Sequence, residues 1–240
     1  MTPPASGFRN RLLALLTKQQ TELLRPSLEE VPLDLRQVLE APGKPIPHVY
    51  FLQSGLASVI ARTRHDRQIE VGMVGFEGMT GLAIVLGDDR SSNETLVQAA
   101  GSGLRIPSDR LRQAMEASPA LRGVLLRYVE AFITQASQTA LANGRAKLEE
   151  RLARWILMSH DRFAGGELRI THEFLAVMLG VRRPGVTIGL HYLEGKGLIR
   201  STRGLIVVLD REGLVEQANG SYGVPEAEYE RLLGRPTGAA

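Results

Sequence analysis

The stretch THEFLAVMLGVRRPGVTIGLHYLEGKGLIRSTRGLIVVLD, which runs from Thr171 to Asp210, carries the pattern that decides the fold. Its apolar periodicity predicts two short helices, His172–Leu179 and Pro184–Lys196, joined by a tight turn. Gly180 stands at that turn, where a positive φ angle favours glycine. The apolar residues that would lock the two helices together are Leu175, Leu179, Val181, Val186, Leu190 and Leu193. We therefore predict a helix-turn-helix motif.

A two-stranded wing is expected directly after the second helix. Gly197–Arg200 and Leu205–Leu209 read as strands, and the turn between them falls at Arg203-Gly204. A helix-turn-helix lays its second helix in the major groove of DNA, and neighbouring residues contact the phosphates. The residues expected to contact DNA are Thr171, Arg182, Arg183, Thr187, Ile188, His191, Arg200 and Arg203.

The start of the second helix leaves two roles open for its arginines. Proline disfavours α geometry in the residue before it, so the helix is expected to begin at Pro184, with Arg182 and Arg183 in the turn. Either arginine could read a guanine edge through two hydrogen bonds or clamp a phosphate. Ile188 suits a thymine methyl group and cannot read guanine.

Positive charge gathers around this motif. Residues Gly144–Arg203 hold eleven Lys and Arg against six Asp and Glu, whereas the rest of the chain holds 18 against 20. A basic segment on a nearly neutral body favours a partner that carries phosphates, and Arg200 and Arg203 in the wing are assigned to such contacts. A winged helix that docks a protein is the alternative, and the basic bias weighs against it.

Two longer helices are predicted before the motif. Arg145–Phe163 has an apolar stripe and ends at Gly165-Gly166, ahead of a short strand at Leu168–Ile170. Before it, Ser118 can cap a helix that runs to about Asn143. Because that helix outreaches a small domain, a partner helix from a second subunit is favoured over packing against its own β-domain. The expected seam residues are Leu121, Leu125, Tyr128, Phe132 and Ala136.

The N-terminal half of the chain has a different pattern of residue types. Phe8–Leu24 reads as a helix, and between Ser27 and Pro107 short runs of Val, Ile and Leu are separated by Gly, Pro and Asp clusters. Such spacing is typical of an antiparallel sandwich or barrel. The expected strands are Ile46–Leu52, Ala57–Arg62, Gln68–Met73, Leu96–Ala99 and Leu104–Pro107. A short helix, Ser108–Ala117, would follow with Ser108 as its cap.

These motifs together resemble the Crp/Fnr regulators. The matching residues of the C-terminal half are Leu175-Ala176, Leu179-Gly180, Arg183, Leu190 with Leu193, Gly197-Leu198-Ile199, Arg203-Gly204, and Asp210 with Leu214. In the N-terminal half, Pro42-Gly43 and the run His48–Gly55 resemble the opening of the family's cyclic-nucleotide-binding β-roll. The resemblance covers residues 10–217.

The resemblance implies an α+β fold in four parts. Residues 1–117 would form an N-terminal helix and a cyclic-nucleotide-binding-like β-roll (a double-stranded β-helix, or jelly roll), and 118–143 a dimerisation helix. Residues 144–217 would form a winged helix-turn-helix domain, and 218–240 a C-terminal tail. It further implies a transcription regulator that binds an inverted repeat in double-stranded DNA as a homodimer and works with RNA polymerase.

The β-roll departs from the members that bind cyclic AMP. Those members carry Gly-Glu for the ribose and Arg-Ser/Thr-Ala for the cyclic phosphate, whereas the matching positions here are Gly78-Met79 and Asn93-Glu94-Thr95. A carboxylate at Glu94 would repel the phosphate, and a shifted register would use Arg90-Ser91-Ser92 instead. We therefore predict no cyclic AMP binding in the family's way and leave an unidentified effector open. The candidate pocket residues are Gly78, Met79, Arg90, Asn93, Glu94 and Thr95.

Composition excludes several other classes. The chain has no cysteine, which rules out disulfides, thiolate nucleophiles and Cys-ligated zinc or iron–sulfur sites. No two of its five histidines stand three or four residues apart, and no catalytic pattern is found, so we predict neither a metal site nor an enzyme. A haem sensor with His48 or His65 as axial ligand is a further alternative. Residues 1–7 are expected to be disordered, without a signal peptide, and the apolar runs are too short to span a membrane, so a cytoplasmic location is predicted.

Overall fold

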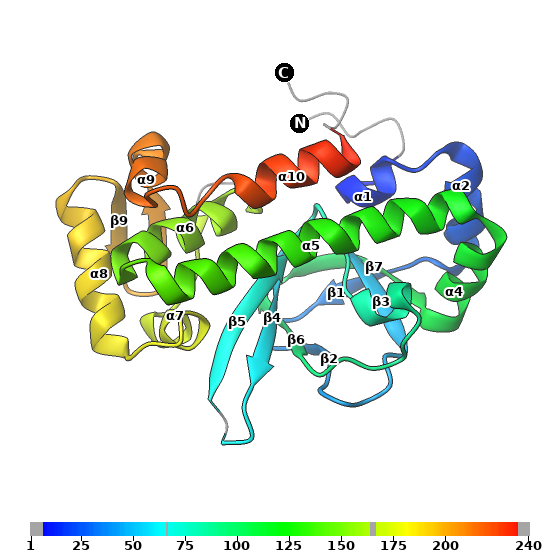
Figure 1. The fold of residues 1–240 in the computed structure, drawn as a ribbon, viewed down its shortest axis with the longest axis horizontal. Helices are drawn as coiled ribbons and strands as arrows, with labels where there is room; N and C mark the ends of the chain where they lie inside the picture. The colour runs from blue at the N-terminus through cyan, green and yellow to red at the C-terminus, as the bar shows by residue number, and fades with distance from the viewer. Residues whose placement is uncertain (1–6, 66, 164–166, 235–240) are drawn as a thin grey trace. The chain divides into compact units, whose positions relative to one another are not determined.

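The computed structural model describes residues 7–65, 67–163 and 167–234 and has an α+β fold (Figure 1). Two compact units divide the chain. The first comprises Met1–Val59, Met73–Ile133 and Ala227–Ala240, and the second comprises Ile60–Gly72 and Thr134–Glu226. Two of the predictions, disorder over residues 1–6 and a helix break at Gly165-Gly166, lie outside the described residues.

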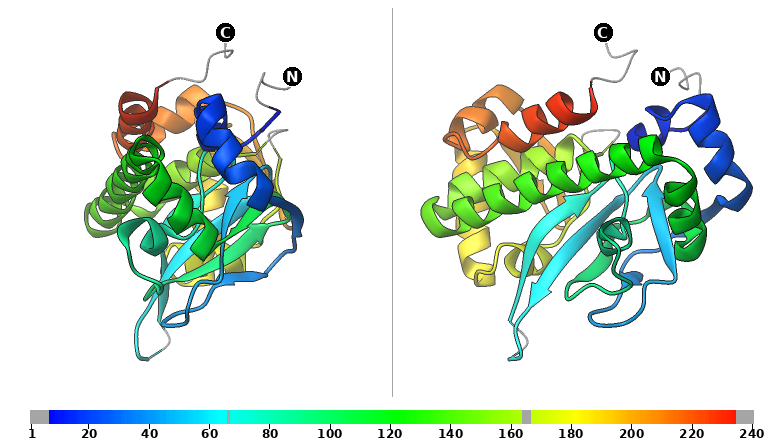
Figure 2. Two further views of the ribbon diagram at one scale, coloured as in Figure 1. Left: turned by 90° about the vertical axis from the view of Figure 1, so that its right-hand side faces the viewer. Right: turned by 45° about the vertical axis from the view of Figure 1, so that its right-hand side comes forward.

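The first unit contains the predicted β-roll, built from two antiparallel sheets. The three-stranded sheet has the order β1-β7-β3 and the four-stranded sheet the order β2-β6-β4-β5. The strands are β1 (Glu29–Leu33), β2 (Val38–Glu40), β3 (His48–Leu52), β4 (Leu56–Arg62), β5 (Gln68–Val74), β6 (Glu94–Ala99) and β7 (Gly101–Pro107). Figure 2 shows β4 and β5 as a long hairpin, whose far end, Ile60–Gly72, is counted with the second unit.

The first two helices of the first unit start where polar side chains satisfy their free N–H groups. The single helix predicted over residues 8–24 is two helices, α1 (Arg11–Ala14) and α2 (Lys18–Leu24), followed by a 3-10 turn, Arg25–Ser27. The chain breaks between them because Thr17 caps α2 in a reciprocal pair of hydrogen bonds with Gln20. Two further helices of this unit are α3 (Leu82–Leu86) and α4 (Ser108–Ala117).

Ser108 does not act as the cap that the sequence predicted. Helix α4 has the predicted bounds, but Pro107 is its N-cap and no side chain caps it. The Ser108 hydroxyl instead donates to the carbonyl of Ile46, at 2.6 Å, and so ties the helix start to the chain before β3. The hydroxyl is used here for tertiary packing, since the buried Ile46 carbonyl needs a donor.

The long helix α5 (Pro119–Arg145) carries the residues that were predicted to form the dimer seam. Ser118 caps it as expected, accepting from the N–H of Leu121. The apolar stripe on its first half, however, faces the core of its own unit, because Leu121, Leu125 and Tyr128 pack there with β-roll residues. Phe132 is also buried, and Ala136 is half-buried. The helix therefore packs against its own β-domain along this stripe, which the sequence left as the alternative.

Residues of the C-terminal tail form helix α10 (Val224–Leu233). Its end belongs to the first unit, where Leu233 is buried in the core and the Tyr229 hydroxyl donates to the Glu77 carbonyl at 2.6 Å. The Arg11 guanidinium lies 6.0 Å from the Phe76 ring centroid and 5.6 Å from that of Tyr229. The end of α10 is thus part of the folded core.

The second unit holds the helix-turn-helix and its wing (Figure 1). Strands β8, β10 and β9 form a three-stranded antiparallel sheet in that order. The elements are α6 (Leu148–His160), β8 (Glu167–Leu168), α7 (His172–Met178), α8 (Arg183–Gly195), β9 (Ile199–Thr202), β10 (Leu205–Val208) and α9 (Arg211–Gln217). Within the described ranges, no helix combines the length and the apolar character needed to span a membrane.

Candidate nucleic-acid interface

The turn between α7 and α8 is built by small residues at points of close approach. Gly180 has φ +61° and ends the turn that follows α7. On α8, a Cβ atom at Gly189 would lie 2.4 Å from a Leu152 methyl carbon, so only glycine lets α6 and α8 pack this closely. Leu175, Val186 and Leu190 are fully buried between the helices. These contacts hold α8 rigidly on the surface of the unit.

The first turn of α8 begins one residue earlier than predicted. Arg183 is the first helical residue, and Arg182 is its extended cap with φ −82° and ψ 143°. The Arg182 carbonyl accepts from the N–H groups of Gly185 and Val186, at 3.0 and 3.4 Å. Pro184 is tolerated because the first N–H groups of a helix have no partner inside the helix. The expectation that Arg183 lies in the turn is therefore wrong by one position.

Side chains predicted to contact DNA reach solvent from α8 and the wing. Arg182, Arg183 and His191 are exposed, and Ile188 is 70% exposed, which is unusual for an isoleucine. In the wing, Arg200 is exposed on β9, and Arg203 is exposed in the turn that follows, where Gly204 has φ +75°. No hydrogen bond or ion pair within the described residues holds the side chain of Arg182 or Arg183.

Three other residues of the helix-turn-helix differ in their exposure to solvent. Thr171 is exposed, and its hydroxyl caps α7 by accepting from the N–H of Phe174 at 3.2 Å. Thr187 is half-buried and is engaged by protein groups. Tyr192 is also exposed on α8, and no sequence pattern had indicated it.

His172 was also missed by the sequence analysis. Its Nδ1 atom lies 3.0 Å from the Thr187 hydroxyl, which joins the first residue of α7 to the second turn of α8. Burial lowers the pKa of His172, and the nearby charges of Arg183 and His191 lower it further. Only the fold brings these residues together, since His172 and Thr187 are 15 positions apart in the chain.

Two arginines of helix α6 donate hydrogen bonds to the helix-turn-helix and to neighbouring segments of the second unit. Arg151 donates to the carbonyl of Leu179 at the end of α7. Arg154 donates to the Ser221 carbonyl at 2.9 Å and to the Thr139 hydroxyl at 3.1 Å. Burial lowers the pKa of both arginines, so these contacts come with a desolvation cost that the hydrogen bonds offset.

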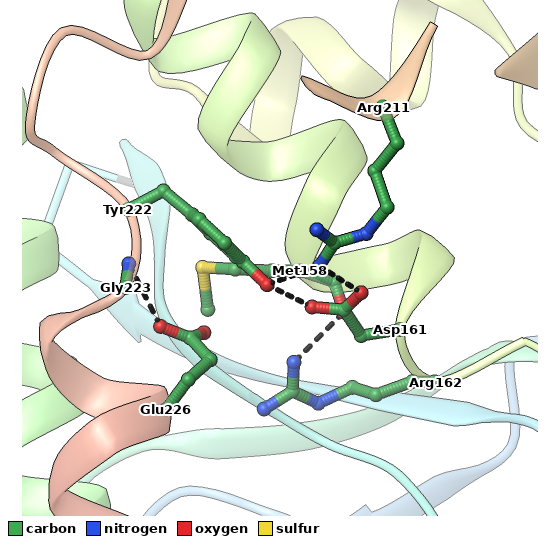
Figure 3. Close-up of polar contacts among 7 residues, drawn as sticks. All are labelled: Met158, Asp161, Arg162, Arg211, Tyr222, Gly223 and Glu226. Carbon is green, nitrogen blue, oxygen red and sulfur yellow. Dashed lines mark hydrogen bonds and ion pairs between the residues drawn. The ribbon is translucent and has the colours of Figure 1, made fainter. Parts of the chain in front are cut away.

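A second polar cluster fixes the chain after the wing (Figure 3). The Asp161 carboxylate accepts from Arg211 at 2.8 Å and from the Tyr222 hydroxyl. Burial and the hydrogen bond to Asp161 raise the pKa of Tyr222. Beside it, the N–H of Gly223 donates to the Glu226 carboxylate at 3.0 Å, at the start of α10. The cluster therefore ties the end of α6 to the segment that connects α9 with α10.

Solved structures resemble the whole fold at low sequence identity. A putative transcriptional regulator of the Crp/Fnr family from Eubacterium rectale is 20% identical with a TM-score of 0.66, covering 85% of this chain and 96% of that one. CLP from Xanthomonas campestris, described as a c-di-GMP responsive global regulator, is 18% identical with a TM-score of 0.65, covering 80% and 99%. A CRP/FNR family transcriptional regulator from Thermus thermophilus is 23% identical with a TM-score of 0.63, covering 81% and 100%.

Residues 150–217 match the family model of the Crp-like helix-turn-helix domain. This range contains α7, α8 and the wing, on a fold shared with Crp/Fnr regulators. Residues 150–217 are therefore similar to the Crp-like helix-turn-helix domain, and the fold of the chain is that of solved Crp/Fnr regulators. The resemblance predicted from the sequence is thus confirmed. No curated protein matches the chain closely enough to indicate a relationship by sequence.

The β-roll uses two of its candidate pocket residues for its own packing. At Gly78, a Cβ atom would lie 2.0 Å from the Tyr128 hydroxyl oxygen, so the ring of Tyr128 occupies that space. Met79 is fully buried in the core, and its carbonyl accepts from the same hydroxyl at 3.2 Å. Arg90 is exposed and pairs with Asp89 at 3.2 Å.

The remaining candidates lie at the start of β6. Asn93 and Glu94 are half-buried, whereas Thr95 is buried and pairs in register with Glu40 of β2. Of the six candidate residues, Thr95 is thus the one placed beside a second buried polar side chain of the β-roll.

Glu40 is a buried acid of this β-roll that the sequence analysis missed. Its carboxylate accepts from the N–H of Gly81 at 2.6 Å and from the side chains of Thr80 and Thr95. Burial raises the pKa of Glu40, and the three hydrogen bonds partly counter this effect. The carboxylate therefore takes up the hydroxyl of Thr95, which the sequence predicted to be a pocket residue. No pattern in a single sequence distinguishes Glu40 from the exposed acids beside it.

Proposed function

We propose that this protein is a sequence-specific DNA-binding transcription regulator that binds an inverted-repeat operator as a homodimer. The observation that carries the proposal is the set of exposed side chains at the N-cap of α8 and along the helix, Arg182, Arg183, Ile188 and His191, within the domain that matches the Crp-like model. Arg182 and Arg183 have no internal partner within the described residues, which leaves both guanidinium groups available to bases or phosphates.

The side chains divide into two classes of contact. Arg183 and Ile188 lie on α8 and suit base edges, Arg183 for guanine and Ile188 for a thymine methyl group. Arg200 and Arg203 are exposed in the wing and suit phosphates, which contribute affinity at every sequence. Thr171, Thr187 and His191 complete the proposed DNA surface.

A homodimer is proposed through a row on α5 that differs from the predicted seam. Leu126, Ile133 and Leu141 are 38%, 49% and 56% exposed, and their spacing places them on one side of the helix. Exposed apolar residues in such a row are favourable only when a partner covers them. Two subunits joined along this row would each present one α8 to the operator.

The β-roll is proposed not to bind cyclic AMP in the usual way. Glu40 already takes the N–H of Gly81 and the hydroxyl of Thr95, and a cyclic phosphate would have to displace this carboxylate or lie beside it. Isothermal titration with cyclic AMP should therefore give no stoichiometric binding, whereas micromolar binding would contradict this part of the proposal. Another effector, contact with RNA polymerase and action in the cytoplasm stay predictions.

Selection of duplexes from a random pool tests the proposed DNA binding. We expect an inverted repeat with half-sites about one helical turn apart, bound with an affinity that falls steeply with salt. Arg110→Ala, which changes an exposed arginine of α4 in the first unit, is the matched control for variants of the α8 arginines. If no duplex is bound even at low salt, the proposal is wrong, and docking of a protein becomes the better reading.

A further inference from the structure

The polar contacts of Thr187 favour one arrangement of hydrogens around the ring of His172. The Thr187 hydroxyl lies 3.3 Å from the carbonyl of Arg183, to which it donates, and 3.0 Å from Nδ1 of His172. A hydroxyl has a single hydrogen, so when that hydrogen is given to the Arg183 carbonyl, the ring must donate to the hydroxyl oxygen. In this arrangement Nδ1 of His172 carries the hydrogen, and Nε2 holds a lone pair in the neutral ring.

The position of His172 in the motif determines what its Nε2 lone pair would meet when DNA is bound. His172 is half-buried and is the first residue of α7. In a helix-turn-helix, the first helix crosses the DNA backbone. A neutral ring with Nδ1 committed to Thr187 offers a phosphate only the Nε2 lone pair, which repels it. The ring can donate to a phosphate through Nε2 only after it has gained a proton.

We propose that His172 is a DNA-contacting residue that takes up a proton as the protein binds DNA, donating Nε2–H to a backbone phosphate while Nδ1–H keeps Thr187 in place. The inference rests on the proposed function and adds a specific contact to it. One proton from solvent is bound to Nε2 in the complex and is released when the complex dissociates. No other bond changes.

The charges that face His172 set the direction of the effect. Arg183 and His191 face the ring from α8, and Glu173 follows it on α7 and is exposed. In the free protein, burial first and then the charges of Arg183 and His191 keep the pKa of His172 below its ordinary value. A phosphate raises it, so the complex binds more protons than the free protein, and affinity must increase as the pH falls.

Binding measurements across pH test the proposal. Anisotropy titrations of the full chain with its selected duplex, from pH 6 to pH 8 at constant salt, should show affinity rising as the pH falls, by at most about tenfold per pH unit for a single proton. Calorimetric titrations in two buffers with different ionisation enthalpies should show net proton uptake per subunit. Wild-type binding with no proton uptake would overturn the inference while leaving the proposed function intact.

Three variants assign the proton to His172. His172→Gln keeps a donor but cannot titrate, so it should remove most of the proton uptake at an unchanged melting temperature. His48→Gln, which changes a half-buried histidine of β3 in the first unit, is the matched control and should retain the uptake. Thr187→Val removes the acceptor of Nδ1 and should reduce the uptake, because the neutral ring can then place its hydrogen on Nε2. Uptake that survives in His172→Gln, or that disappears in His48→Gln alone, contradicts the assignment.

Nitrogen NMR of the free protein at pH 8 provides a test without DNA. The neutral ring of His172 should be the Nδ1–H form, and an Nε2–H form would overturn the inference. A complete lack of DNA binding by the wild-type protein would overturn the proposed function and this inference with it, so the two failures are distinguishable.

Discussion

The start of α8 and the interior of the β-roll use polar side chains in opposite ways. At α8, Arg182 and Arg183 reach solvent without an internal partner among the described residues. In the β-roll, the Glu40 carboxylate is buried and takes three donors, including the hydroxyl of Thr95. A surface that binds a partner leaves its charges available, whereas a pocket whose donors are already engaged has little to offer an anionic ligand.

The largest expected effect comes from separating the two subunits. Ile133→Glu places a charge in the exposed row of α5 and should give monomers, because a buried unpaired carboxylate is costly at a helix seam. Loss of the second α8 should weaken operator binding by at least about 100-fold. Sedimentation and anisotropy measure the two effects.

Leu86→Glu is the control for this variant, since Leu86 is equally apolar and exposed on α3. Phe132→Glu distinguishes the two faces of the helix. It should lower the thermal stability of the subunit, because Phe132 is buried. A stable dimer of Ile133→Glu at micromolar concentration would exclude the exposed row as the interface.

The next effect concerns the role of one arginine at α8. Arg183→Ala should weaken binding to the selected operator by about 1–3 kcal/mol and relax selection at one base pair of each half-site. Binding to operators mutated at each position measures the change. If affinity falls equally for every sequence, Arg183 contacts phosphate, and base reading has to be assigned to its neighbours.

A smaller effect is expected at the buried acid of the β-roll. Because the pKa of Glu40 is raised in the folded protein, the native state binds more protons than the unfolded state, and stability falls as the pH rises above 4.5. Glu40→Gln removes this dependence and keeps an acceptor for the N–H of Gly81. Urea unfolding at pH 4.5 and pH 7.5 should show a smaller loss of stability for the variant.

The contrast between the two sites would weaken if Glu40→Gln behaved like the native protein in this assay. Glu30→Gln serves as the control, since Glu30 is an exposed acid on β1. An unchanged pH dependence in Glu40→Gln would mean that another group dominates it, whereas Glu30→Gln should leave the native dependence in place.

The smallest effect is expected at the cluster of Figure 3. Tyr222→Phe removes the hydroxyl that donates to Asp161 but leaves the Arg211 contact in place. It should lower the free energy of unfolding by about 1 kcal/mol, measured by urea denaturation at pH 7. DNA affinity should not change, because the cluster lies after the wing and outside the proposed contact surface. A loss of DNA affinity at unchanged stability would contradict this placement.

The sequence predicted the helix-turn-helix well because local patterns determine it. The apolar spacing of Leu175 to Leu193 and the glycine at position 180 follow from the geometry of two short helices and a left-handed turn. The face of α5 could not be assigned in the same way. A stripe shows that a helix is covered on one side, but the covering surface, here the β-roll core around Tyr128, depends on contacts between distant residues.

Other features of the structure could not be predicted from the sequence. Strands β1 and β2 are short, and their sequences EEVPL and VLE lack the alternation that predicts a strand. Glu40 meets Thr80 and Thr95 only because β2 pairs with β6. The fold likewise brings His172 and Thr187 together from distant positions in the chain. The polar contacts of Glu40 and of His172 could therefore not be predicted from the sequence.

The C-terminal helix has a practical consequence for handling the protein. Helix α10 starts in the second unit, beside Glu226, and ends in the first, where Leu233 fills part of the core. A shortened chain that stops after α9 would still contain the whole domain that matches the Crp-like model. It would, however, expose the apolar surface that Leu233 and Tyr229 cover. Expression vectors for this protein should therefore retain helix α10 and place any C-terminal purification tag after it.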